Sequence, residues 1–111
     1  MNRERAGRGG RRSGLMTRVE IETTLRQHKE TLRRRFKVRD IGVFGSCVRG
    51  EQTRGSDIDI LVEFDQPVGL FEFMELEEYL ATLLDAKIDL VSKKALKPRI
   101  GKRILEEVVY I

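Results

Sequence analysis

Two aspartates, Asp57 and Asp59, lie in residues 57–64 (DIDILVEF), a stretch that otherwise alternates like a buried strand. Residues two apart on a strand project from the same face, so the two carboxylates would lie close together. Like charges at such a distance repel, and one carboxyl would take up a proton unless a cation lay between them. Hard carboxylate oxygens suit Mg²⁺, which keeps coordination positions for substrate phosphates. The pair predicts a magnesium site, although an Asp-x-Asp motif alone also occurs in turns and on solvated faces.

A third aspartate, Asp89, lies in the short segment KIDLVS between Ile88 and Leu90. On a strand it would point to the face opposite its apolar neighbours. If that strand pairs beside residues 57–64, Asp89 can join the first two carboxylates. Three acidic side chains on neighbouring strands could hold two metal ions and activate a hydroxyl.

Gly45 and Ser46 follow a predicted strand and open a short helical turn that reaches Arg49. Unpaired N–H groups at such a turn suit an anion, and glycine lets the main chain approach a ligand. Ser46 could donate to a phosphate or only cap the turn, since strand–Gly–Ser–helix is common turn chemistry. Beside a metal-binding pair, the turn predicts a triphosphate cradle that works by positioning and charge neutralisation. Arg49 could reach a phosphate or stay solvated, and Ser56 could orient the aspartates or belong to an ordinary loop.

The elements that must position these residues follow from the hydrophobic periodicity. Helices are predicted at residues 17–35, 70–84 and 98–109, strands at 37–44, 57–64 and 87–91, and a helical turn at 46–49. In the second helix, the side chains expected to face inward are Leu70, Phe73, Met74, Leu76, Leu80, Leu83 and Leu84. This order predicts an α/β (α+β) fold, with a small mixed sheet of three or more strands and helices packed on it.

The chain has 111 residues, enough for one domain with a modest core. Its net charge of +4 lies in residues 1–15, and residues 16–111 sum to zero with 17 basic and 17 acidic side chains. We expect residues 1–15 to be a disordered basic tail, because they bury too little to order themselves. Such a tail could bind phosphates weakly, but nucleic acid is not the expected partner.

The location expected from the sequence is the cytoplasm. No apolar run could span a bilayer, and the N-terminus lacks the apolar core of a signal peptide. The single cysteine, Cys47, cannot form an internal disulfide, which agrees with a reducing compartment.

Together these motifs resemble the DNA polymerase beta–like nucleotidyltransferase superfamily, in which a Gly-Ser pair precedes an Asp-x-Asp pair and a later Asp. Two segments, GSCVRGEQTRGSDIDILVEF and KIDLVSKKALKPRIGKRILEEVVYI, are similar to the minimal nucleotidyltransferases of bacteria and archaea. The likeness covers residues 16–111, which would form one nucleotidyltransferase domain.

The resemblance implies a role for most of the candidates. Gly45 and Ser46 would contact the nucleotide phosphates, whereas Arg49 and Ser56 remain candidate contacts because of their positions and not because of the resemblance. The resemblance implies that Asp57 and Asp59 hold the metal ions and that Asp89 assists the attacking hydroxyl. Strand geometry makes Asp89 a candidate metal ligand as well. The transferred group would be AMP from ATP, with pyrophosphate leaving.

The resemblance also implies a partner. Many single-domain members are antitoxins encoded beside a HEPN-type ribonuclease toxin, and some place AMP on a tyrosine of that toxin. The alternative is a non-catalytic nucleotide- or partner-binding module that neutralises a toxin by occlusion, although the intact Asp57, Asp59 and Asp89 weigh against it. Part of the apolar arc of residues 70–84 could receive a partner subunit, so a homo- or hetero-oligomer is compatible with the sequence.

Overall fold

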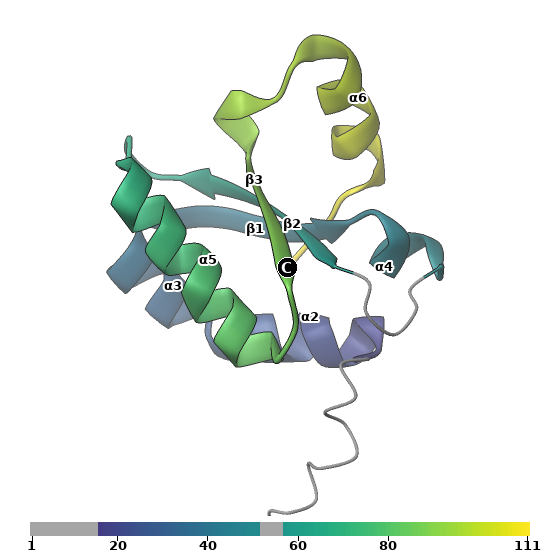
Figure 1. Cartoon of the computed structure of the whole chain (residues 1–111), viewed down its shortest axis with the longest axis horizontal. Coiled ribbons are helices and arrows are strands. Elements are labelled where there is room, and N and C mark those ends of the chain that lie inside the picture. Colours follow the sequence, from purple (N-terminus) through teal and green to yellow (C-terminus); the bar gives the residue numbers. More distant parts are fainter. Residues whose placement is uncertain (1–15, 52–56) are drawn as a thin grey trace, which may run out of the picture.

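The computed structural model describes residues 16–51 and 57–111, so the predictions for residues 1–15 and for Ser56 lie outside the described residues (Figure 1). The helices are α2 (Arg18–Gln27), α3 (Lys29–Phe36), α4 (Ser46–Arg49), α5 (Leu70–Leu84) and α6 (Pro98–Glu107), with a 3-10 turn, η1 (Lys93–Ala95). The strands are β1 (Val38–Phe44), β2 (Ile58–Phe64), β3 (Ile88–Ser92) and β4 (Val109–Tyr110).

The four strands form one sheet in the order β3-β2-β1-β4. Strand β1 pairs antiparallel with both β2 and β4, whereas β2 pairs parallel with β3. A parallel pair needs a long crossover connection, which α5 supplies. The sheet is therefore mixed, and the predicted α/β (α+β) class is confirmed.

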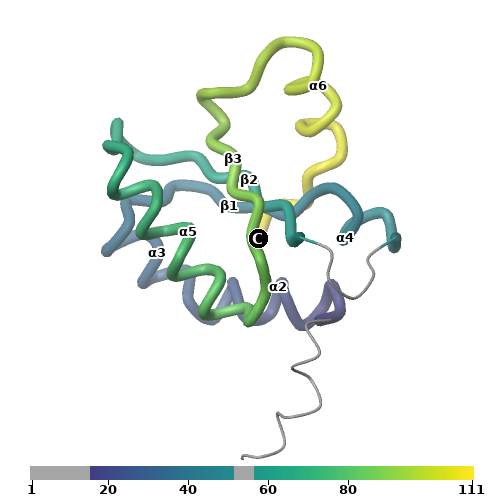
Figure 2. The backbone as a smooth tube through the Cα atoms, viewed as in Figure 1, coloured from purple at the N-terminus to yellow at the C-terminus, as the bar shows by residue number. Residues whose placement is uncertain are grey.

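The core lies between one face of the sheet and the helices α2, α3 and α5, which Figures 1 and 2 show on the same side of the strands. Alternate residues of β2 and a stripe of α5 form its centre, each at most 1% exposed: Ile58, Ile60, Val62, Leu76, Leu80 and Leu84. Because side chains alternate along a strand, Asp59 projects from the other face of β2. That face is the one toward α6, which stands apart from the other helices in both figures.

Two residues predicted to face inward from α5 do not. Leu70 is 71% exposed and Met74 is 50% exposed. The helix is apolar over a wider arc than the sheet can cover, and both residues lie at the edge of that arc, away from the buried stripe. Periodicity identified the helix but not how much of its apolar surface contacts the core.

The helix predicted over residues 17–35 is two helices that meet at His28. The ring Nδ1 of His28 donates to the carbonyl oxygen of Thr24 at 2.9 Å, and its backbone N–H bonds to the carbonyl of Leu25 at 3.1 Å. The side chain thus takes the acceptor that the helical backbone would use, which interrupts the hydrogen-bond ladder. The start of α2 is as expected, since Thr17 and Glu20 form a reciprocal capping box.

The helix predicted over residues 98–109 ends at Glu107, and β4 follows it. The backbone of Val108 is already extended, with φ −62° and ψ 140°. Strand β4 approaches β1 so closely that a Cβ on Gly42 would lie 2.7 Å from Cγ2 of Val108 and 2.9 Å from the carbonyl oxygen of Val109. The missing side chain at Gly42 is what lets β4 join the sheet.

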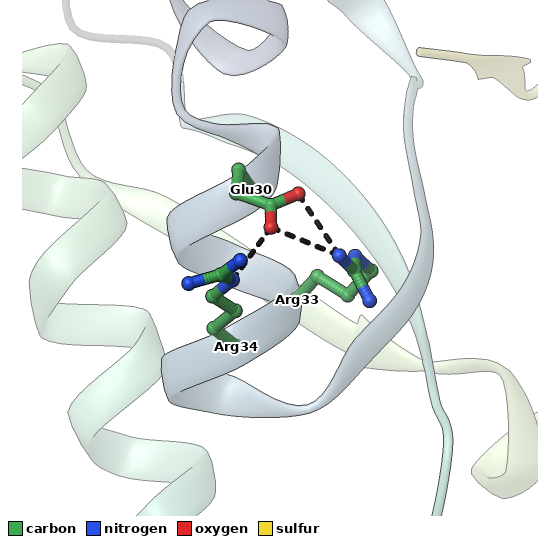
Figure 3. Close-up of polar contacts among 3 residues, drawn as sticks. All are labelled: Glu30, Arg33 and Arg34. Atoms are coloured by element: carbon green, nitrogen blue, oxygen red, sulfur yellow. Dashed lines mark hydrogen bonds and ion pairs between the residues drawn. The ribbon is translucent and has the colours of Figure 1, made fainter.

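A run of arginines ends α3, and its members have local partners. Arg33 and Arg34 bind the carboxylate of Glu30 at 2.9 and 2.6 Å, as Figure 3 shows. The guanidinium of Arg35 lies over the ring of Phe36, 4.9 Å from its centroid. Positive charge at this end of the helix also suits the helix dipole.

Candidate active site

The parallel register of β2 and β3 brings two of the predicted carboxylates together, because it places Asp59 opposite Asp89. Burial raises the pKa of Asp59 to about 6, helped by a side-chain hydrogen bond with Asp89 and by the negative charges of Asp89 and Asp57. The positive charge of Arg49 lowers the pKa of Asp59. The repulsion predicted for closely spaced aspartates is therefore present, and at neutral pH a cation would relieve it.

The third carboxylate, Asp57, is exposed and directly precedes β2. The negative charge of Asp57 contributes to the raised pKa of Asp59. Among residues 16–51 and 57–111, however, no group of three or more His, Cys, Asp or Glu side chains is arranged to hold a metal ion. The structure therefore joins Asp59 with Asp89 and leaves Asp57 beside them. The donors that face each other are carboxylate oxygens, and their chemistry fits a hard divalent cation.

The Gly45 turn lies against this acidic pair. Gly45 has φ +77°, a left-handed conformation that glycine adopts without strain. A Cβ at this position would overlap the carboxylate of Asp59, whose Cγ would lie 2.9 Å away. The predicted close approach at Gly45 is thus real, but the group approached in this structure is a carboxylate of the protein.

Ser46 is the first residue of α4, and the N-cap position falls on Gly45. The capping alternative considered for Ser46 is therefore wrong. The amide of Gly45 is engaged within the protein, because it donates to Oε2 of Glu107 at 2.6 Å. The amides of Val48 and Arg49 donate to the carbonyl oxygen of Gly45 at 3.0 and 3.1 Å, so the amides of α4 left for an anion are those of Ser46 and Cys47.

Arg49 is the last residue of α4, and its side chain is 44% exposed. Its Nη1 donates to Oε1 of Glu107 at 2.6 Å, and its Nε donates to Oε1 of Glu51 at 3.0 Å. The hydrogen bonds to Glu51 and Glu107 raise the pKa of Arg49. Arg49 is therefore held in place at the rim of the site rather than being freely solvated.

Glu107 was not predicted as a site residue. Burial alone would raise the pKa of its carboxyl, but the hydrogen bonds from Gly45 and Arg49 outweigh that effect and hold the pKa below its ordinary value. One local signal in the sequence pointed to a strand after Glu107. It was the β-branched and aromatic run Val108-Val109-Tyr110 directly after an amphipathic helix. Read as a strand, that run would have placed Glu107 beside β1.

A cavity of about 230 Å³ joins Asp59 to Gly45, Arg49 and Glu107. Its lining comes from the end of β1, the turn, β2 and α6: Phe44, Gly45, Arg49, Asp59, Ile100, Arg103, Ile104 and Glu107. Larger hollows of about 290 and 400 Å³ lie beside Phe64 and beside Leu105, away from the carboxylates. A third larger hollow, of about 320 Å³, is lined by charged side chains of α2, α3 and β1. We identify the site by the presence of Asp59 and the Gly45 turn in its lining, since the linings of these three larger hollows include neither.

No helix in the described part of the chain combines the length and the hydrophobicity needed to cross a membrane.

The sequence pattern of the nucleotidyltransferase domain family matches residues 25–111. The chain is also similar to the protein adenylyltransferase MntA of Thermococcus cleftensis. The two are 55% identical over 97 residues, which are 87% of this chain and 98% of the relative.

Solved structures have the same fold. One is a toxin–antitoxin crystal structure with AMP-PNP, with a TM-score of 0.64 and 29% identity, covering 76% of this chain and 69% of that one. Another is the tri-AMPylated HEPN toxin of Shewanella oneidensis in complex with its MNT antitoxin, with a TM-score of 0.60 and 23% identity over 81% of this chain and 70% of that one. At that identity the second likeness indicates the fold alone.

Proposed function

The chain belongs to the nucleotidyltransferase domain family, and from that premise we propose that it transfers AMP from ATP to a hydroxyl of a partner protein with the help of Mg²⁺. The observation that carries the proposal is the paired carboxylates of Asp59 and Asp89 directly beside the Gly45 turn. The adenylyltransferase activity named for the archaeal relative supports AMP as the transferred group.

In this proposal the carboxylates of Asp57, Asp59 and Asp89 hold the metal. When bound, the metal would neutralise negative charge on the triphosphate and on the attacking oxygen. Asp59 and Asp89 have the oxygen donors and the mutual repulsion that a cation would offset, and the exposed Asp57 completes the set.

The turn and its neighbours bind the triphosphate. The amides and hydroxyl at Ser46 would hold phosphate oxygens, and Arg49 would contribute positive charge at the rim. Gly45 contributes by lacking a side chain, which keeps the phosphate-binding turn against Asp59. We retain Ser56 as a proposed contact.

The reaction is a substitution at the α-phosphorus. The hydroxyl oxygen of the acceptor forms a bond to that phosphorus, the bond to the bridging oxygen of the β-phosphate breaks, and pyrophosphate leaves. The exposed carboxylate of Asp89 receives the proton of the hydroxyl. Catalysis rests on alignment of the two oxygens and on charge stabilisation.

The proposed acceptor is a HEPN-type toxin, and the proposed role is that of its antitoxin. The support is the sequence resemblance, together with the toxin–antitoxin complexes in which chains of this fold occur. We place the reaction in the cytoplasm, where ATP is available and Cys47 stays reduced. The described elements form one compact fold, so we propose residues 16–111 as the catalytic domain.

The test uses the full chain, Mg-ATP and the purified product of the neighbouring gene, whose intact mass is then measured. We expect the mass of the acceptor to rise by whole AMP units. Asp59→Asn should reduce the rate by roughly 10³-fold or more, since it removes charge from the centre of the site. Asp40→Asn, at an exposed aspartate of β1 outside the site, should act like the parent.

Two results would contradict the proposal. One is an acceptor that gains no AMP. The other is an Asp59→Asn variant that transfers AMP as fast as the parent. If Asp59→Asn instead neutralised the toxin as well as the parent without any transfer, the occlusion alternative would replace catalysis.

A further inference from the structure

We propose that Glu107 is a positioning residue for nucleotidyl transfer, whose carboxylate fixes the Gly45 turn and the guanidinium of Arg49 in one orientation toward the triphosphate. The inference rests on the proposed function, because the turn and Arg49 are its proposed phosphate contacts. Glu107 itself would not touch the reacting atoms.

The contacts of Glu107 are divided between main chain and side chain. Its Oε2 accepts the Gly45 amide at 2.6 Å and its Oε1 accepts Nη1 of Arg49 at 2.6 Å. One carboxylate therefore links the first and last positions of the Gly45–Arg49 segment. Both bonds are short, as expected for hydrogen bonds to an ionised group.

The register of the sheet explains why this side chain is there. In the antiparallel pair of β1 and β4, Val43 lies opposite Val109. Gly45 lies two residues after Val43, just beyond the end of β1, and Glu107 lies two residues before Val109. Continuing the register therefore brings these two residues together. The two-residue strand β4 thus delivers a carboxylate from the end of α6 to the turn.

Arg49 retains donors for a ligand after it has bound its two carboxylates. A guanidinium has five N–H groups in a planar fork. The bonds to Glu51 and Glu107 use Nε and Nη1, so within residues 16–51 and 57–111 Nη2 is the end available to a phosphate. Because Nε and Nη1 are both hydrogen-bonded, the orientation of Nη2 is set before the nucleotide binds. The Arg49 side chain therefore loses less rotamer entropy on binding.

A carboxylate in this place could also act as a blocker, by occupying the anion site until ATP displaces it. The two roles predict opposite changes on neutralisation. Removing a blocker would tighten nucleotide binding, whereas removing a positioning group would weaken it. The geometry favours positioning, because Glu107 binds the Gly45 amide and leaves the amides of Ser46 and Cys47 to an anion.

The experiment compares Glu107→Gln with Glu106→Gln in the full chain. Glu107→Gln keeps the shape and one acceptor for the Gly45 amide but loses the charge that holds Arg49. We expect kcat/KM for ATP to fall roughly 10- to 100-fold, the usual range when the support of a functional group is lost, with KM for the acceptor protein unchanged. Glu106 is exposed and outside the cavity, so its variant should stay within about twofold of the parent.

A double-mutant cycle with Arg49→Gln separates positioning from a general structural role. If Glu107 acts through Arg49, the double variant should be no slower than Arg49→Gln alone, within about twofold. Losses that multiply would overturn the proposal. Glu107→Asp, measured in the same way, replaces Glu107→Gln if that variant does not fold.

Equilibrium binding of AMP-PNP keeps this test separate from the proposed function. If the parent transfers no AMP, the proposed function fails, but weaker AMP-PNP binding by Glu107→Gln would still support the positioning role. Equal or tighter binding by the variant would overturn it.

Discussion

Glu30 and Glu107 each accept hydrogen bonds from an arginine, yet the two clusters are assembled in different ways. Glu30 binds Arg33 and Arg34, which lie three and four residues farther along its own helix (Figure 3). Glu107 binds Arg49 and the Gly45 amide, which lie 58 and 62 residues away in sequence. The side chain of Glu30 is 57% exposed, whereas that of Glu107 is 24% exposed.

The difference shows which charge clusters depend on the fold. Residues three and four apart meet on any α-helix, so the Glu30 cluster forms wherever α3 forms. The Glu107 cluster needs β1, α4, α6 and the register of β4 at the same time. A cluster that depends on so many elements can fix the geometry of a site, but it is also the more easily disturbed.

The largest effect on stability is expected from breaking the register that supports Glu107 without touching any charged residue. Gly42→Ala places a Cβ against Val108 and the backbone of Val109, which should push β4 away from β1. We expect a loss of roughly 1–3 kcal/mol in the free energy of unfolding, typical of overpacking, measured by urea denaturation. AMP transfer measured at a temperature where the variant is fully folded should fall about 10-fold, as it does when a supporting group is lost.

A result in which Gly42→Ala is destabilised but transfers AMP at the parental rate would mean that β4 is not needed to place Glu107. The Glu30 cluster should be unaffected in this variant, since it lies within one helix.

A smaller effect is expected from the acidic pair, through pH. The pKa of Asp59 is raised from 3.8 to about 6 in the folded chain, so the native state holds a proton that the unfolded state has released across that interval. Stability should therefore decrease as pH rises from about 4 through about 6, relative to an Asp59→Asn variant that cannot titrate. After allowance for solvent screening, the parent should be less stable than Asp59→Asn by about 1 kcal/mol at pH 7.

The measurement is thermal unfolding of both proteins between pH 4 and 8, without divalent cations and then with MgCl₂. Magnesium should raise the melting temperature of the parent at pH 7 and leave that of Asp59→Asn unchanged, because a ligand that binds only the native state stabilises it. Parallel pH curves for the two proteins would contradict the repulsion at the site.

The smallest effect is expected at the surface cluster. Glu30→Gln removes the charge that Arg33 and Arg34 share, and all three side chains are more than half exposed. We expect the melting temperature to change by no more than about 1 °C and AMP transfer to be unchanged, since exposed pairs contribute little. A large loss of stability would show that the two clusters differ less than their geometry indicates.

The fold could be predicted wherever the chain has a clear local period. The alternation of β2 placed Asp59 on the face of the strand away from the buried Ile58 and Ile60. The parallel register of β2 and β3 then brought Asp89 beside Asp59. The face of Asp59 followed from strand geometry alone, whereas the sequence prediction for Asp89 was conditional on β3 pairing beside β2, which the structure shows. The chemistry assigned to the two aspartates depended on the resemblance to a family, since an Asp-x-Asp pair has no unique function.

The parts that could not be predicted depend on tertiary contacts. Strand β4 has two residues, too few for an alternating pattern. Val108 also matches the apolar period of α6, so periodicity alone extends that helix beyond Glu107. Without β4 there was no reason to place Glu107 near Gly45. The break at His28 likewise came from one side-chain bond, to the carbonyl of Thr24, in a helix whose periodicity was otherwise continuous.

Gly45 has a consequence for how this chain can change over generations. Any side chain at position 45 would collide with the carboxylate of Asp59, and the φ of +77° would strain it even without that aspartate, so two separate constraints keep glycine there. In a descendant that no longer needs catalysis, loss of the aspartate would remove the collision but leave the strain of the positive φ, so the glycine would still be favoured. Inactive copies of this gene should therefore lose the aspartate before the glycine, and the reverse order should be rare.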